Sequence, residues 1–144
     1  MTDEKIFRER AAGYMVCYSH VCTKQAVCLR RKLAGYIPET QANTLSVNLN
    51  YKDVETAQCP LFKSAEKVPM AVGMIHLLDT VPYDTARHIK RHLITELGRK
   101  RFYAYRNGSQ PIPPHVQQRI ADVFRENGYG EAPLFDAYTE DYEF

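Results

Sequence analysis

Four cysteines are the residues of this chain whose type and spacing could support special chemistry. Three of them occur close together with four and five residues between them, and the fourth follows thirty residues later, directly before Pro60. Zinc is commonly held in a tetrahedron by four soft ligands such as thiolates. The spacing matches none of the common zinc patterns, but it predicts one zinc ion that joins a loop, a helix and a distant segment through Cys17, Cys22, Cys28 and Cys59.

Two alternatives to zinc remain open for the same four thiols. An iron–sulfur cluster also uses four cysteines, and a proline after the last cysteine occurs in ferredoxin-type sequences. Without metal, the thiols would be buried like small apolar side chains. His20 could replace one thiolate, although a histidine in a loop is more often exposed to solvent. Because no nucleophile signature surrounds any of the cysteines, we expect that the protein is not an enzyme.

The second candidate site is the basic and aromatic segment 99–108. Arginine and lysine contact phosphates, and tyrosine can donate to a phosphate or stack on a base. We therefore expect nucleic-acid contacts from Arg99, Lys100, Arg101, Tyr103 and Arg106. The alternative is a solvated face that pairs with the acidic C-terminal region, since residues 120–144 hold seven acids and one arginine.

Two local structures compete for this segment. We favour a hairpin, because Asn107-Gly108 is a type I′ turn signal between a strand at 102–106 and a return at 109–112. The alternative is a short helix over 99–107, which would turn Phe102 and Tyr105 toward the core. In that case residues 84–127 would resemble, loosely, the small helix-turn-helix regulators.

The remaining elements follow from hydrophobic periodicity and from residues that begin or end helices. Leu45, Val47, Leu49 and Tyr51 alternate with polar residues, which predicts a half-buried strand over 44–51. The clearest helix has apolar residues at helical spacing and ends before Gly98. We expect helices at 5–12, 24–33, 70–78, 84–97 and 113–127.

Composition and the order of these elements predict the fold class. The chain has 144 residues, of which 44% are hydrophobic and 25% charged, as in ordinary globular proteins. We predict an α+β fold, mainly helical, with one or two short strands or a hairpin. A cysteine-containing lobe (1–66) precedes a helical lobe (67–144) with an acidic aromatic tail, unless both form one compact domain.

The compartment is predicted from what the sequence lacks. The first residues have no apolar stretch of the kind that signal peptides carry, and no apolar run is long enough to cross a membrane. We therefore expect a cytoplasmic protein, in which thiols stay reduced. Nothing in the sequence indicates a small-molecule substrate.

Several of these patterns resemble an uncharacterised bacterial family, a domain of unknown function. The resemblance rests on Cys17-x4-Cys-x5-Cys-Leu-Arg, on Cys59-Pro60 with Phe62, on the run from Phe102 to Phe124, and on the closing aromatic-acidic tail. It covers nearly the whole chain and implies no particular activity.

These observations predict a small metal-stabilised binding protein whose partner is nucleic acid and whose role is regulatory. The cysteines would hold the scaffold, and the basic segment would make the contacts. One alternative is a protein-interaction module with no nucleic-acid role. Another is a redox sensor that uses the four thiols or an iron–sulfur cluster.

Overall fold

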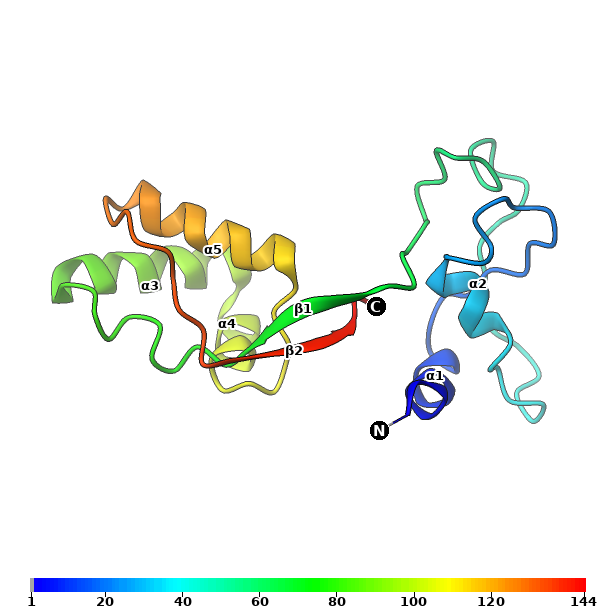
Figure 1. The fold of residues 1–144 in the computed structure, drawn as a ribbon, viewed down its shortest axis with the longest axis horizontal. Helices are drawn as coiled ribbons and strands as arrows, with labels where there is room; N and C mark the ends of the chain where they lie inside the picture. The colour runs from blue at the N-terminus through cyan, green and yellow to red at the C-terminus, as the bar shows by residue number, and fades with distance from the viewer. Residues whose placement is uncertain (1) are drawn as a thin grey trace. The chain divides into compact units, whose positions relative to one another are not determined.

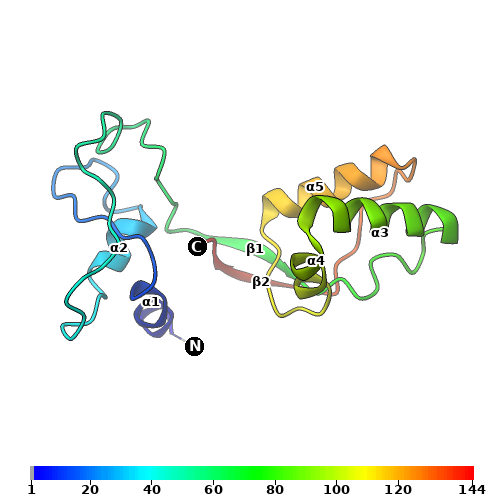
Figure 2. The same cartoon turned by 180° about the vertical axis from the view of Figure 1, so that it is seen from behind.

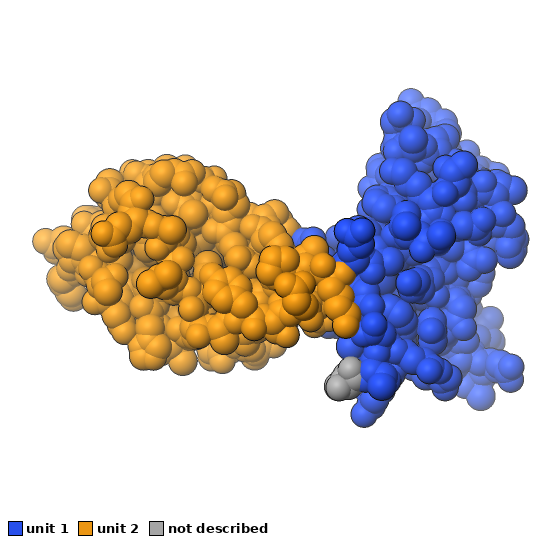
Figure 3. Space-filling view, in the orientation of Figure 1, with its two compact units in different colours: residues 1–66, 142–144 blue, residues 67–141 orange. Residues whose placement is uncertain are grey.

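The computed structural model of the protein describes residues 2–144 and confirms the α+β prediction. The described residues divide into two units, which Figure 3 colours separately. Unit 1 runs to Glu66 and includes Tyr142–Phe144, and unit 2 is Lys67–Asp141. The elements in chain order are α1 (Asp3–Ala11), α2 (Leu29–Ala34), β1 (Lys67–Val72), α3 (Tyr83–Leu97), α4 (Arg99–Arg106), α5 (Pro114–Glu126) and β2 (Ala137–Tyr142) (Figure 1).

Unit 2 is built on the three helices α3, α4 and α5. The helices predicted at 84–97 and 113–127 are confirmed, because long amphipathic patterns with clear ends specify helices well. Each helix turns an apolar stripe to one shared core. Within the described residues, this core comprises Ala71, Met74, Leu77, Val81, Ile89, Leu93, Phe102, Tyr105, Ile112, Ile120, Val123 and Phe124.

The helix predicted over 70–78 is wrong, because residues 67–72 form strand β1. It pairs with β2 as a two-stranded sheet, and both views show the two strands side by side (Figures 1 and 2). After β1 the chain turns at Gly73, whose φ of 83° favours glycine. The Asp136 carboxylate then accepts the N–H groups of Ile75 at 2.8 Å and His76 at 3.3 Å. These contacts hold a turn where periodicity alone suggested a helix.

The hairpin favoured for 102–112 is also wrong, and the helical alternative is confirmed as α4. Phe102 and Tyr105 are each 3% exposed and lie in the core, as that alternative predicts. After α4, Ile112 forms an antiparallel bridge with Ala71. The connection 107–113 between α4 and α5 is longer than the three- or four-residue turn of a DNA-binding helix-turn-helix.

Unit 1 has a smaller apolar cluster around α1 and α2. The predicted helix 5–12 is confirmed with slightly earlier bounds, since the Thr2 side chain accepts the N–H of Lys5 and caps α1. The rings of Phe7 and Tyr142 lie 5.0 Å apart. The Tyr142 hydroxyl also donates to the Asp3 carboxylate at 2.9 Å, so the last residues described belong to this cluster.

The helix predicted over 24–33 is wrong in its first half, since α2 begins only at Leu29. Cys28 has extended backbone angles and forms an antiparallel bridge with Ser64. The neighbours of Cys28 take part in the same pairing. The N–H of Leu29 donates to the Lys63 carbonyl, and the N–H of Ala65 donates to the Val27 carbonyl. This long-range pairing outweighs the local helical preference of residues 24–28.

The strand predicted over 44–51 is wrong as well. Ser46 alone forms a parallel bridge, with Val16, and the chain then enters turns. Val47 is buried as the alternation predicts, but Leu45 and Tyr51 are 61% and 49% exposed. A half-buried strand needs neighbours on its edges and one covered face, and this segment has neither over its full length.

Candidate functional site

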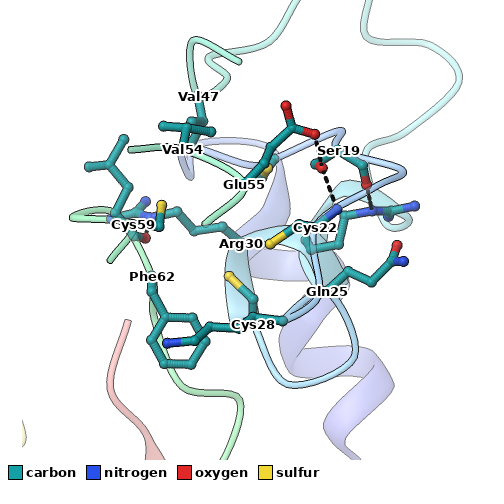
Figure 4. A pocket seen from close by; sticks show the side chains of 14 residues that line it. Ser19, Cys22, Gln25, Cys28, Arg30, Val47, Val54, Glu55, Cys59 and Phe62 are labelled. Carbon is teal, nitrogen blue, oxygen red and sulfur yellow. Dashed lines mark hydrogen bonds between the residues drawn. The ribbon is translucent and has the colours of Figure 1, made fainter. Parts of the chain in front are cut away.

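All four cysteines line one small cavity in unit 1. The cavity measures about 30 Å³, close to the volume of one water molecule. In Figure 4 the sulfur atoms of Cys22 and Cys28 point into the same space, and Cys59 approaches from the opposite side. Cys28 is buried, Cys17, Cys22 and Cys59 are partly buried, and all four are free thiols. The structure therefore places every residue of the predicted metal site along one cavity, and metal binding itself stays a prediction.

Local hydrogen bonds place each cysteine at this cavity. The N–H of Cys17 donates to the Arg30 carbonyl at 3.0 Å, which holds the first loop against α2. Cys28 is the residue that precedes the first turn of α2. The N–H of Cys59 donates to the Thr56 carbonyl at 3.2 Å within a turn. Three segments that are distant in sequence thus converge.

Ser19 and Glu55 form a partly buried polar link that sequence reasoning missed. Ser19 is 1% exposed, and its hydroxyl donates to the Glu55 carboxylate at 2.6 Å (Figure 4). The same oxygen accepts the N–H groups of Val21 at 3.3 Å and Cys22 at 3.1 Å. Glu55 has a φ of 70°, a strained value for a residue with a side chain. The link therefore fixes the Cys22 loop at some conformational cost.

Arg30 is a second positioning residue that the sequence did not indicate. Its Nε donates to the Leu61 carbonyl at 2.7 Å, and its Nη1 donates to the Met15 carbonyl at 3.0 Å. These carbonyls lie two residues after Cys59 and two residues before Cys17. One guanidinium thus joins two cysteine-bearing segments. No local pattern could reveal this role, because both partners are backbone groups far away in sequence.

The surroundings of Cys17 favour its protonated thiol. The pKa of Cys17 is raised, first by burial and then by the proximity of the other three thiols, against a hydrogen bond from the Ser19 N–H. A bound cation would reverse this preference and favour thiolates. In residues 2–144, no three or more His, Cys, Asp or Glu side chains already stand as a metal-ligand group. The four cysteines line the same cavity, but a metal would have to draw their sulfur atoms together.

The basic segment lies at the exposed surface of unit 2. Its four cations are exposed, and Tyr103 is half-buried. Lys90 of α3 and Arg99 of α4 lie 6.0 and 5.8 Å from the centre of the Tyr103 ring. We call Lys90, Arg99, Lys100, Arg101, Tyr103 and Arg106 the α3–α4 basic face.

The cations of the α3–α4 basic face make no ion pair with any carboxylate among residues 2–144. Arg119 on α5 behaves differently, since it is paired with Glu96 and with Glu126. The alternative that the acidic C-terminal region neutralises this segment therefore has no ion pair to support it in this part of the chain.

The histidines add no ligand to either site. His20 is exposed and does not line the cysteine cavity. His92 on α3 lies 3.3 Å from the Glu96 carboxylate, and its Nδ1 lies 3.3 Å from the Asn127 side-chain nitrogen. His88 is exposed on the same helix. Both His88 and His92 therefore lie at the surface of α3.

Comparisons with known proteins give one match. A family model described as a family of unknown function, DUF6078, matches residues 1–144. Searches of curated proteins and of solved structures give no match. A bacterial source and the similarity to helix-turn-helix regulators therefore stay predictions. Across the described residues, no helix combines the length and apolar character needed to cross a membrane.

Proposed function

We propose, for a chain that belongs to the DUF6078 family of unknown function, a small binding protein in which a zinc ion stabilises unit 1. The observation that carries this proposal is the convergence of Cys17, Cys22, Cys28 and Cys59 on one cavity. Four thiolates form a common structural zinc site, closed to substrate and water. The cysteines would then hold the scaffold and perform no reaction themselves.

The surroundings of the cavity support this role. Hydrogen bonds around a structural metal site orient the ligand-bearing segments and raise the affinity for the metal. Arg30 and the Ser19–Glu55 link provide such contacts around the cysteine cavity. The sulfur atoms of Cys17, Cys22 and Cys59 belong to loops and turns, which can adjust to a metal more readily than helices.

Metal content and the visible spectrum test this proposal. The protein is purified without oxygen and without added metal, and its bound metals are measured by mass spectrometry. We expect one zinc per chain, no visible absorbance, and loss of zinc in the Cys22→Ser variant, with His20→Ala as the matched control. A brown protein that contains iron would instead support the iron–sulfur sensor. A protein with no metal, even after anaerobic incubation with zinc, would refute the metal site.

The proposed partner of unit 2 is nucleic acid. The supporting observation is that the α3–α4 basic face keeps its cations free of carboxylates, while Arg119 and Arg125 of α5 are paired. Placing like charges together without partners costs stability, and a polyanion would relieve this repulsion. Because Tyr103 already lies near two cations and packs edge-on against Phe102, we expect phosphate contacts more than base stacking.

Binding to labelled oligonucleotides at several salt concentrations tests this partner. We expect fluorescence anisotropy to report binding at low salt that weakens as salt rises, since phosphate contacts release counterions. The double variant Arg101→Ala/Arg106→Ala should weaken binding at least about tenfold and flatten the salt dependence. Arg125→Ala is the control, because this α5 cation is paired with Asp122. No binding to single or double strands at low salt would refute the proposal and favour a protein partner.

A further inference from the structure

We infer that unit 2 contains a second binding site, for a small amphiphilic anion, between the turn 74–79 and helices α3 and α4. A cavity of about 220 Å³ lies there. It has room for several water molecules, whose share of liquid volume is about 30 Å³ each. Drug-sized ligands occupy larger pockets of about 300–1,000 Å³. The volume suits a ligand with one or two rings or a short acyl chain.

The floor of the cavity is apolar and fixed. Met74, Leu77 and Phe102 line it and belong to the core of unit 2, with exposures of 3%, 6% and 3%. Ile75 forms an exposed part of the wall. An apolar concavity with few polar groups at its rim is the usual form of a small-molecule site. The floor therefore selects the uncharged body of the ligand.

The rim of the cavity selects an anionic head group. Lys90 from α3 and Arg106 from α4 both line the cavity, both are exposed, and neither has a carboxylate partner among residues 2–144. Asp79 also lies at the rim, but its carboxylate is 2.8 Å from Nδ1 of His76. Lys90 and Arg106 thus place two positive charges at the rim, whereas the one carboxylate there already contacts His76. The opening of the cavity therefore carries net positive charge. A carboxylate, sulfonate or phosphate ester matches it, since arginine can bind such groups with two parallel hydrogen bonds.

Backbone contacts prepare this site in advance. The N–H of Met74 donates to the Arg106 carbonyl at 3.1 Å, which ties the turn to the end of α4. The Asp136 carboxylate holds the following N–H groups of Ile75 and His76. Because the backbone of the turn is already held, the entropy cost of binding is limited to ordering the exposed side chains at the rim. The site adjoins the proposed contact with nucleic acid, because Lys90 and Arg106 belong to both.

A pair of probes that differ by one phosphate group tests the inference. 1-Naphthyl phosphate carries the anionic head and 1-naphthol lacks it, and both fluoresce where this tryptophan-free protein does not interfere. We expect fluorescence anisotropy of the full-length protein to show at least about tenfold tighter binding of the phosphate. Inorganic phosphate alone should displace it poorly, because it has no apolar body. Equal affinity for the two probes, or no binding of either, would overturn the inference.

Variants locate the binding within the molecule. Lys90→Ala and Arg106→Ala should each weaken binding of 1-naphthyl phosphate about tenfold and leave binding of 1-naphthol unchanged. Lys100→Ala is the matched control, since Lys100 is an exposed cation of α4 that does not line this cavity. Circular dichroism verifies that the exposed substitutions leave the fold intact. If Lys100→Ala weakens binding as much as the other two, the probe binds to general surface charge and the site is refuted.

Discussion

The two units are similar in length, but each is stabilised internally by different interactions. Unit 2 has helices of 15, 8 and 13 residues around a cluster of twelve buried residues. Unit 1 has helices of 9 and 6 residues and a cluster of seven, counted over the described residues. Cys28, Val47 and Val54 are buried but lie outside this cluster. The loops that carry the cysteines therefore have little apolar core of their own.

Polar contacts replace the missing core in those loops. Arg30 and Arg31 donate to carbonyls of neighbouring loops, and Lys24 donates to the Ala57 carbonyl. Single hydrogen bonds of this kind contribute about 0.5–3 kcal/mol each, which is small against the entropy of ordering some thirty loop residues. Small domains with weak cores usually add disulfides or metals. The difference between the units is thus the physical reason to expect a cross-link in unit 1.

Metal removal should produce the largest effect, and this effect should be confined to unit 1. With a strong chelator in excess, we expect the amides of residues 16–30 and 54–64 to exchange hydrogen rapidly, because a structural zinc contributes about 10 kcal/mol to folding. The amides of α3 and α5 should stay protected. Hydrogen exchange followed by mass spectrometry on the full-length protein measures both regions in one sample.

Unchanged hydrogen exchange after metal removal would contradict this prediction. If the chelator leaves the exchange of residues 16–30 unchanged, unit 1 does not depend on metal and the comparison between the units fails. The Cys59→Ser variant should reproduce the effect of the chelator, since three thiolates bind zinc less tightly than four. Re-addition of zinc should restore protection in the unchanged protein.

Phe124→Ala should produce the next largest effect, in unit 2. Phe124 is 1% exposed and lies in the core of unit 2, so truncation should cost about 3–5 kcal/mol of unfolding free energy. Leu134→Ala is the control, because Leu134 is 76% exposed and should change stability by less than about 0.5 kcal/mol. Urea denaturation followed by circular dichroism measures both. Equal losses from both variants would contradict the core described for unit 2.

The difference between the units also explains how much of each fold could be predicted from the sequence. In unit 2, α3 and α5 were predicted because their apolar stripes repeat over three turns or more. The short α4 was assigned as a hairpin, because the Asn107-Gly108 turn signal outweighed eight residues of weak periodicity. The strand β1 was missed, since its partner β2 lies more than sixty residues away. Local patterns cannot report such a partner.

In unit 1, residue types predicted the candidate site better than local patterns predicted the helices and strands. The four cysteines were chosen for their chemistry, and the structure places them on one cavity. The helix and strand predicted around them were wrong, because Cys28 and Ser46 take their backbone partners from distant segments. Arg30 and the Ser19–Glu55 link were missed for the same reason. Long-range polar contacts leave no periodic trace in a sequence.

Arg30→Met should have an effect of intermediate size on unit 1, and it tests whether polar contacts stabilise the cysteine loops. Methionine keeps the apolar stem but leaves the carbonyls of Met15 and Leu61 without their donor. We expect a loss of about 1.5–3 kcal/mol, as for hydrogen bonds from a charged group, together with weaker retention of zinc against a chelator. Lys32→Met, an exposed cation of the same helix, is the control. If zinc retention is equal in both variants, Arg30 does not position the cysteine loops.

The smallest effect should come from the ion pair that joins α3 and α5 in unit 2. Arg119 holds the pKa of Glu96 below its usual value, mainly through a hydrogen bond to the carboxylate. Because the folded pKa is the lower one, the pair stabilises the fold above the unfolded pKa of Glu96. This contribution is lost as pH falls through the folded pKa.

Glu96→Gln should therefore lower the melting temperature slightly at pH 7 and should not change it at a pH below the folded pKa, where Glu96 is protonated in both states. Salt should reduce the difference at pH 7, because both partners are partly exposed and are screened by ions. Asp84→Asn, which removes a long and exposed contact to Arg87 at 4.0 Å, is the control. Differential scanning calorimetry at the two pH values measures the shift. A larger loss at low pH than at pH 7 would contradict the assigned direction, and a loss that rivals Phe124→Ala would show that unit 2 also depends on polar cross-links.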